Sequence, residues 1–291
     1  MDPAAPSSIR ALLREHGLHP RKRLGQHFLA DGNILERIAR LAVTSPDDRV
    51  IEIGAGLGGL TLRLAALAER VTAIEVDSAM QPALRQTLGG RTNVETVFGD
   101  FLNLDMPHFL DAAFGESRGV VAGNIPYNIT SPILERLFEH MDRIRRIVLL
   151  VQREVAERLA ARPGTRAWGN LSVFAQYHAS VQLEGFVPAH LFLPAPDVAS
   201  AIVVLEPHPD PPVAVCDFAT FRRVVHAAFG YRRKTLANAL VQGGVVADAT
   251  MATEILLGLG MDPMRRGETL GLTEFGRLAN AVHSTGGREP N

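Results

Sequence analysis

Cysteine is almost absent from this sequence. Its 291 residues include one, Cys216, so no internal disulfide can form. No Cys/His spacing typical of zinc is present, and we expect no metal site. No apolar run approaches the roughly 20 residues that a membrane-spanning helix needs, and the N-terminal segment lacks the apolar stretch of a secretory signal. These absences exclude disulfide-rich and membrane-spanning classes and predict a cytoplasmic protein that does not associate with membranes.

An excess of positive charge is also missing, since the formal net charge is −1. The basic residues are nevertheless concentrated in two places. Residues 1–28 contain five basic and two acidic side chains, and residues 221–236 contain five basic side chains and no acidic ones. Local clusters of this kind are compatible with a nucleic-acid partner, although the basic and acidic residues of the whole chain nearly balance. The contents of 46% hydrophobic and 21% charged residues are ordinary for a globular protein.

Short β-branched runs alternate with segments of helical periodicity over most of the chain. Strands are predicted at residues 49–53, 71–76, 94–98, 120–122, 147–151 and 199–205, and helices at 59–68, at 78–88 and from Ser131. Asp31 is predicted to cap a further helix that contains Ile34, Leu35 and Ile38. Strands separated by helices form right-handed βαβ units. The pattern therefore predicts an α/β domain with a mostly parallel sheet.

The proline-rich stretch 207–212 has the composition of a linker, and helical spacing dominates beyond it. We therefore predict an α/β domain over residues 1–207, including a basic N-terminal arm, and a small all-α domain over 213–285. Residues 286–291 are predicted to form a disordered tail.

The first predicted strand runs directly into the glycine-rich sequence Gly54-Ala55-Gly56-Leu57-Gly58-Gly59. Such glycines let backbone N–H groups approach a ligand at the start of a helix. Glu75, at the end of the second strand, suits an acid that accepts from ribose hydroxyls. Asp100, after the third strand, is placed to accept from the amine of an adenine. Together they indicate an adenosine-containing ligand, either a nicotinamide dinucleotide or S-adenosylmethionine; the alternative is a tight turn with solvated acids.

Asn124-Ile125-Pro126-Tyr127 follows another predicted strand, at the sheet edge where open α/β proteins bind ligands. An adenine amine is a poor nucleophile because its lone pair delocalises into the ring. Hydrogen bonds to the Asn124 side-chain oxygen and the Ile125 carbonyl would localise that pair, while Pro126 fixes the turn and Tyr127 offers a face for stacking. The tetrapeptide is also an ordinary turn sequence. Its place beside the glycine loop favours methylation of an amino group, a role with no counterpart in a dehydrogenase.

Three longer motifs surround these residues: Lys22-Arg23-Leu24-Gly25-Gln26-His27-Phe28-Leu29, Phe192-Leu193-Pro194-Ala195-Pro196-Asp197-Val198-Ala199-Ser200, and the segment from Phe221 to Leu240. With them, nearly the whole sequence resembles the KsgA/RsmA family of ribosomal RNA adenine dimethyltransferases. The resemblance implies a Rossmann-like methyltransferase fold with a seven-stranded sheet, and S-adenosyl-L-methionine as the cofactor. It also implies N6,N6-dimethylation of two adjacent adenines near the 3′ end of small-subunit rRNA, by a monomer that acts on immature small subunits.

The resemblance also assigns roles to residues. The cofactor site it implies consists of His27, Leu29, Gly54, Gly56, Glu75, Asp100 and Asn124. The family usually has Asn in place of His27. Phe192 is expected to pack on the target adenine opposite Tyr127, whereas without the resemblance Phe192 would be interpreted as a core residue.

The basic clusters are predicted to contact RNA phosphates, and the residues concerned are Arg21, Lys22, Arg23, Arg222, Arg223, Arg232, Arg233 and Lys234. A solvated helix face is the alternative interpretation of such a charge run. The substrate adenine is expected to be unpaired or flipped out, since a paired base hides its amine. Three other functions stay open: a large-subunit rRNA methyltransferase of the macrolide-resistance type, a non-catalytic nucleic-acid-binding factor and, as the weakest candidate, a dehydrogenase.

Overall fold

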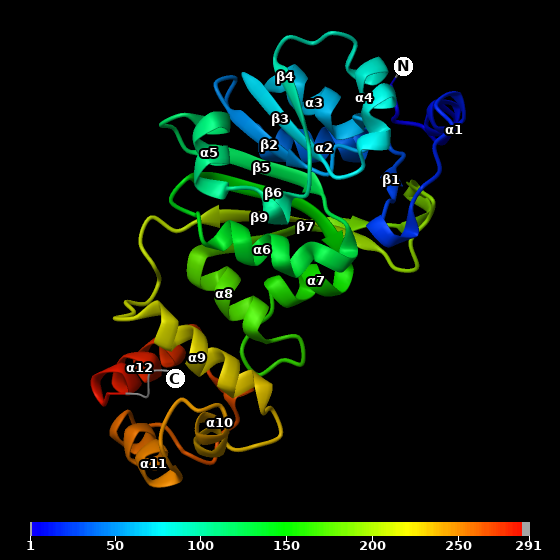
Figure 1. Ribbon diagram of the computed structural model, residues 1–291. Coiled ribbons are helices and arrows are strands. Elements are labelled where there is room, and N and C mark those ends of the chain that lie inside the picture. Colours follow the sequence, from blue (N-terminus) through cyan, green and yellow to red (C-terminus); the bar gives the residue numbers. More distant parts are fainter. Residues whose placement is uncertain (1, 287–291) are drawn as a thin grey trace. The chain divides into compact units, whose positions relative to one another are not determined.

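The computed structural model describes residues 2–286, so the predicted tail lies outside the described residues except for Gly286 (Figure 1). The chain forms two compact units. The first contains residues 1–156 and 180–207, and the second contains residues 157–179 and 208–291. The sequence-based boundary placed residues 157–179 in the first domain.

The first unit is built on a seven-stranded sheet with the strand order β4-β3-β2-β5-β6-β9-β7. Its strands are β2 (Arg49–Ile53), β3 (Arg70–Glu75), β4 (Val94–Phe98), β5 (Gly119–Asn124), β6 (Ile144–Gln152), β7 (Ala179–Val187) and β9 (Ser200–Pro207). The pairs from β4 to β6 are parallel, and β9 runs antiparallel to β6. The prediction of a mostly parallel seven-stranded sheet is therefore confirmed.

Helices cover both faces of this sheet (Figure 1). They are α2 (Gly32–Ala42), α3 (Gly59–Leu67), α4 (Gln81–Leu88), α5 (Met106–Phe114), α6 (Thr130–Phe138) and α7 (Arg153–Leu159), which continues into the second unit. Helix α1 (Pro6–Glu15) instead lies to the side of the sheet, where its buried side chains form a separate cluster with Leu57, Met80 and Ala83. Side chains of α2, α3 and α4, among them Ile38, Leu64 and Leu84, form one hydrophobic core with strand residues such as Val50 and Val120. As predicted, Asp31 caps α2, because its carboxylate accepts from the backbone N–H groups of Asn33 and Ile34.

The strand order reverses between β2 and β5, so the chain leaves these neighbouring strands in opposite directions. Such a reversal opens a crevice at the carboxyl ends of the strands. The glycine loop follows β2 and the Asn124 tetrapeptide follows β5. Topology alone thus brings together the two motifs that the sequence separates by about seventy residues.

The second unit is helical, and consists mainly of α8 (Asn170–His178), α9 (Phe218–Gly230), α10 (Leu236–Gln242), α11 (Ala249–Gly258) and α12 (Leu272–Ser284). Residues 157–179 belong to it because their aromatic side chains pack there. Phe174 makes an edge contact with Phe221 of α9. Trp168 is 1% exposed and donates through its indole N–H to the carbonyl oxygen of Leu270.

Candidate active site

The glycine loop has the backbone shape that the sequence suggested. Gly54, Gly56 and Gly58 all have positive φ angles, of 84°, 55° and 84°. A Cβ atom on Gly54 would lie 3.3 Å from the backbone oxygen of Asn124, and one on Gly56 would lie 3.2 Å from the ring of Phe28. Glycine is therefore needed here both for the conformation and for the close approach of neighbouring segments.

Glu75 is tied to this loop. One of its carboxylate oxygens accepts from the N–H of Gly56 at 2.7 Å and the other from the N–H of Asp77 at 2.9 Å. The side chain is 5% exposed, and burial raises the pKa of the carboxyl although these two N–H groups oppose the shift. Each oxygen retains a lone pair, which is what two ribose hydroxyls would require.

Asp100 lies at the end of β4, beside Glu75. The N–H of Gly99 donates to the Glu75 carbonyl at 3.0 Å. The Asp100 carboxylate caps the short helix Phe101–Asn103 and accepts from the N–H of Leu102 and the side-chain amide of Asn103. Asp100 thus has a structural role as well as the position predicted for an adenine contact.

The N-terminal motif lies directly against the Asn124 tetrapeptide. The Asn124 amide nitrogen donates to the backbone oxygen of His27 at 2.9 Å. A carbonyl oxygen can only accept, so this bond requires the amide nitrogen of Asn124 to face it and leaves the Asn124 Oδ1 available as an acceptor. The His27 ring stacks on Tyr127 with 5.6 Å between centroids and 20° between planes. His27 Nδ1 lies 2.8 Å from the Pro194 oxygen.

The third motif joins the site through a two-stranded sheet. Strand β1 (Phe28–Leu29) pairs antiparallel with β8 (Phe192–Leu193), so that Leu29 lies opposite Phe192. Both side chains belong to the hydrophobic core, and Phe192 is only 4% exposed. In this structure Phe192 therefore does not present an open face opposite Tyr127. Tyr127 itself is half-buried, which raises its pKa, and its hydroxyl is hydrogen-bonded to Ser200.

Arg21 and Arg232, both predicted to contact RNA, form ion pairs with acidic side chains of the protein. Arg21 pairs with the buried carboxylate of Asp77 at 2.9 Å, while Lys22 and Arg23 are exposed. Arg232 pairs with Glu268 and donates to the backbone oxygens of Arg166 and Trp168.

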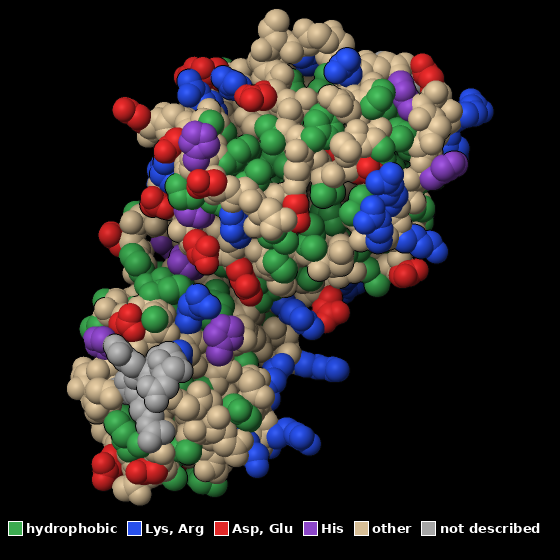
Figure 2. All heavy atoms as spheres, viewed as in Figure 1, with side chains coloured by type: hydrophobic (Ala, Val, Ile, Leu, Met, Phe, Trp, Pro, Cys, Tyr) green, Lys and Arg blue, Asp and Glu red, His purple; other side chains and the backbone are tan. Residues whose placement is uncertain are grey.

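Arg222, Arg233 and Lys234 are exposed and Arg223 is half-buried. Figure 2 shows basic side chains standing out from the surface of the helical unit. Residues 231–234 form a turn between α9 and α10, so this part of the charge run is not a helix face.

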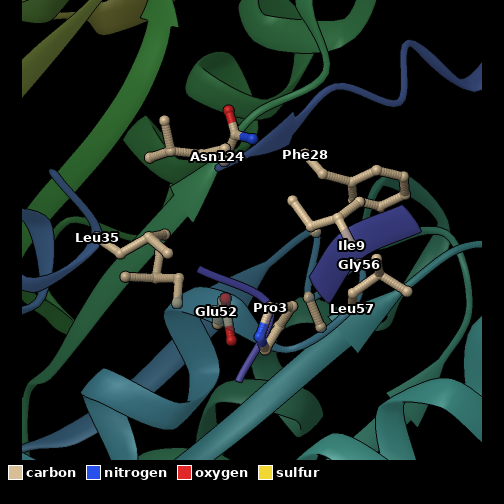
Figure 3. Close-up of a pocket in the computed structure, with 13 residues that line it drawn as sticks. Pro3, Ile9, Phe28, Leu35, Glu52, Gly56, Leu57 and Asn124 are labelled. Atoms are coloured by element: carbon tan, nitrogen blue, oxygen red, sulfur yellow. The ribbon is translucent and has the colours of Figure 1, made fainter. Parts of the chain in front are cut away.

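A small cavity lies between the glycine loop and Asn124 (Figure 3). Its volume is about 50 Å³, and Pro3 and Ile9 of the N-terminal segment help to line it. The carboxyl of Glu52 also lines the cavity. The sequence-based reasoning missed Pro3, Ile9 and Glu52; the only available signal was an acidic residue inside an otherwise apolar strand.

Comparisons with known proteins show what this chain is similar to. Residues 17–276 match the family model described as ribosomal RNA adenine dimethylase. The ribosomal RNA small subunit methyltransferase A of Pelotomaculum thermopropionicum is 44% identical, over 98% of this chain and 99% of its own length. A crystal structure of a dimethyladenosine transferase from Plasmodium falciparum is similar with a TM-score of 0.75 and 26% identity, over 90% of this chain and 99% of that one. The 23S rRNA methyltransferase ErmE is similar with a TM-score of 0.68 and 26% identity, over 88% and 99%.

The fold and the site define an S-adenosylmethionine-dependent methyltransferase. The chain belongs to the ribosomal RNA adenine dimethylase family. The predicted family, fold class, type of enzyme and cofactor are therefore confirmed. None of the helices within residues 2–286 is both long and apolar enough to cross a membrane.

Proposed function

We propose that this chain dimethylates the N6 amines of two adjacent adenines near the 3′ end of small-subunit rRNA. The observation that carries the proposal is the fixed orientation of Asn124, whose amide nitrogen is engaged by the His27 backbone oxygen. This leaves an acceptor at the edge of the sheet, beside the loop that would hold the cofactor. The name of the 44% identical relative favours the small subunit.

In this mechanism S-adenosylmethionine supplies an activated methyl group on its sulfonium. Glu75, with a free lone pair on each oxygen, accepts from the ribose hydroxyls, and Asp100 accepts from the adenine amine of the cofactor. Gly54 and Gly56 allow the backbone to approach the cofactor, and His27 and Leu29 close the site from the N-terminal side.

On the substrate side, the Asn124 Oδ1 and the Ile125 carbonyl accept the two N–H bonds of the target amine in the first transfer, and one of these oxygens accepts the single remaining N–H in the second. Withdrawing those hydrogens from the ring plane localises the nitrogen lone pair toward the methyl donor. Pro126 fixes the turn, and Tyr127 stacks on the base. A preorganised pair of acceptors acts mainly by positioning and electrostatics, so no strong base is required; the proton leaves to water.

Phe192 is proposed as the second stacking partner, but only after the β1–β8 pair has moved, because it is buried here. For RNA phosphate contact we propose the exposed or half-buried basic residues Lys22, Arg23, Arg222, Arg223, Arg233 and Lys234. Arg21 and Arg232 would contribute only part of their charge, since each already has an acidic partner.

The decisive experiment uses labelled S-adenosylmethionine with immature small subunits, mature small subunits and large subunits, followed by mapping of the modified bases. The proposal expects dimethyladenine in small-subunit rRNA only. Label confined to large-subunit rRNA would instead establish the resistance-type activity, which the similarity to ErmE makes the natural competitor. Binding of S-adenosylmethionine without label in any rRNA would instead favour a non-catalytic RNA-binding factor.

The proposal also states that the enzyme is a cytoplasmic monomer and that it acts preferentially on immature small subunits. Light scattering of the purified protein should give one chain per particle, near 31.5 kDa. Immature subunits should be modified faster than mature ones. Equal rates on both would contradict the proposed preference for the immature subunit but not the proposed reaction.

A further inference from the structure

Phe186 is an aromatic side chain that the fold leaves uncovered. It lies near the end of β7, the last strand of the sheet (Figure 1), and is 51% exposed, more than any other Phe, Tyr or Trp within residues 2–286. Single exposed apolar side chains are common on protein surfaces and need no explanation by themselves. Phe186 is different because of its contacts and because of its place in the fold.

The ring of Phe186 is held in one orientation. The Arg153 guanidinium lies over it, 4.7 Å from the ring centroid, which is within the range of a cation–π contact. The backbone of β7 is held as well, because the carbonyl oxygen of Glu184 accepts from Arg37 of α2. Since Arg153 covers one face of the ring, the opposite face and the ring edge are the exposed part. An aromatic face that is already fixed loses little entropy when it binds a ligand.

A short series of contacts links Phe186 to the reaction centre, within the first unit. The backbone N–H of Arg153 donates to the carbonyl oxygen of Ala199 at 3.0 Å. The hydroxyl of the next residue, Ser200, is hydrogen-bonded to Tyr127. The ends of β6 and β9 therefore connect two aromatic rings, Phe186 and the ring that is proposed to stack on the target base.

The chain that follows Phe186 leads into the same site. The next residue, Val187, belongs to one hydrophobic core with Leu29 and Phe192. Phe192 begins β8, which pairs with β1 of the N-terminal motif. Because β1 directly follows the backbone oxygen that orients Asn124, Phe186 lies at the rim of the site rather than at the far end of the sheet.

The surface around Phe186 favours a base over a phosphate. Val198, beside Ala199, is 46% exposed and adds apolar surface. Asp197 and Glu154, the sequence neighbours of Val198 and Arg153, are exposed acids. Carboxylates repel an RNA phosphate, but they do not oppose stacking of a neutral base. Aromatic side chains are the usual platform for single-stranded bases, whatever the sequence, because every base has a π-face.

We propose that the exposed face of Phe186 stacks on the base of the nucleotide next to the target adenine. The inference rests on the proposed function, in which the substrate is an unpaired or flipped-out adenine of rRNA. An adenine that enters the site leaves the base stack, so its neighbour loses a stacking partner at the same time. The ring of Phe186 replaces that partner and holds the strand at the rim of the site. It takes no part in bond formation and should act on substrate binding rather than on methyl transfer.

Steady-state methylation of immature small subunits tests the inference. Phe186→Ala should raise the KM for the subunit by roughly five- to 150-fold, the loss of one base–aromatic stack. The kcat and the Kd of S-adenosylmethionine should stay within about twofold of wild type, because neither depends on that stack. Phe186→Trp and Phe186→Tyr should keep a low KM, whereas Phe186→Leu, which is apolar without a π-face, should not. Leu257→Ala, which removes a 62% exposed side chain of α11, is the control and should behave as wild type.

The stacked base is identified with small subunits reconstituted from rRNA whose 3′ segment is synthetic. One base is omitted, immediately 5′ or immediately 3′ of the adenine whose methylation is followed. At one of these positions the wild-type KM should rise by the same factor as in Phe186→Ala, and the variant should lose nothing further. That position gives the side on which the neighbour lies.

Several results would overturn the inference. These are a wild-type KM for Phe186→Ala, a wild-type KM for Phe186→Leu, and penalties of variant and missing base that multiply at both positions. The last result would indicate that Phe186 contacts a protein of the subunit instead of a base. Absence of label from the wild-type protein in any small subunit would contradict the proposed function itself. Melting temperatures equal to wild type, expected at so exposed a position, verify that the variants are folded.

Discussion

Replacing Glu52 by Gln should shift the stability of the cofactor-free protein, relative to wild type, in favour of the variant as the pH rises. The pKa of Glu52 is about 8 in the folded protein, against 4.5 for an unperturbed carboxyl. Between these values the folded chain holds a proton that the unfolded chain releases. Wild-type stability therefore falls with rising pH across this window, by at most about 1.4 kcal/mol per unit. Below pH 4.5 both states are protonated and the effect is absent.

The size of the effect follows from the same difference. Fully developed above pH 8, the penalty for ionising Glu52 is at most about 4–5 kcal/mol. Gln carries no charge but leaves a polar amide where Glu52 Oε2 has no hydrogen-bond partner among residues 2–286, which costs roughly 1–3 kcal/mol. The two stability curves should thus cross. We expect Glu52→Gln to be equal to or slightly less stable than wild type at pH 5, and more stable by about 2–3 kcal/mol at pH 8.5.

The assay must report on the unit that contains β2. The single tryptophan, Trp168, belongs to the helical unit, so its fluorescence does not follow the sheet. Hydrogen exchange of peptides from β2 and β5, measured at increasing urea concentrations and at several pH values, reports on the sheet. A gap between variant and wild type that stays constant from pH 5 to pH 8.5 would refute the reasoning. Glu36→Gln, which changes a surface acid of the same unit, should run parallel to wild type throughout.

Other substitutions test individual contacts. Asn124→Ala should lower turnover by a factor of about 10² or more with little change in cofactor Kd, because one preorganised acceptor is lost; single-turnover rates and calorimetry measure the two. Tyr127→Phe keeps the ring and loses only the bond to Ser200, so its KM for rRNA should stay within a few-fold of wild type, whereas Tyr127→Ala should weaken rRNA binding by roughly 1–3 kcal/mol. Arg232→Ala should lower the melting temperature because it removes an intramolecular ion pair and two carbonyl contacts. Arg233→Ala should leave the melting temperature alone and reduce the salt dependence of RNA binding by about one ion.

The strands of the parallel sheet could be read from the sequence because buried strands are continuous apolar runs. The predictions at 49–53 and 94–98 coincide with β2 and β4. Strand β7 was missed. Its residues are mostly half-buried and include Gly185 at φ 142°, so it lacks both the apolar run and a clean alternation. Helices α1, α5 and α8 were also missed, α1 and α5 because prolines at their starts were not recognised as first-turn residues.

The grouping of residues 157–179 with the helical unit could not be inferred from the proline-rich stretch. A composition change marks where the chain becomes exposed, but not with which core an earlier segment packs. The aromatic contacts of Phe174 and the indole bond of Trp168 reach partners some fifty to one hundred residues later. Nothing local in the sequence encodes those partners.

The sequence indicated individual candidate residues of the site but not how they lie relative to one another. Gly54 and Gly56 were candidates because a loop that approaches a ligand closely needs glycine, and Glu75 was a candidate because it ends a predicted strand. Glu52 was hidden because its apolar neighbours in the strand made it look like one acid in a core segment. Pro3 and Ile9 reach the cavity only through the path of the N-terminal segment, which periodicity does not reveal.

The substitution of His27 for the family's usual Asn shows how backbone and side chain divide their roles. It is the backbone oxygen of His27 that orients Asn124, and any residue at this position supplies that oxygen. The change of side chain therefore leaves the acceptor geometry of the reaction centre intact. The imidazole instead contacts the Pro194 oxygen and lies on the ring of Tyr127. That ring is the surface on which a target base would stack, so an incoming adenine must either displace the imidazole or use the opposite face. If the proposed mechanism holds, we expect the departure from the family pattern to affect the entry of the substrate rather than the groups that activate its amine.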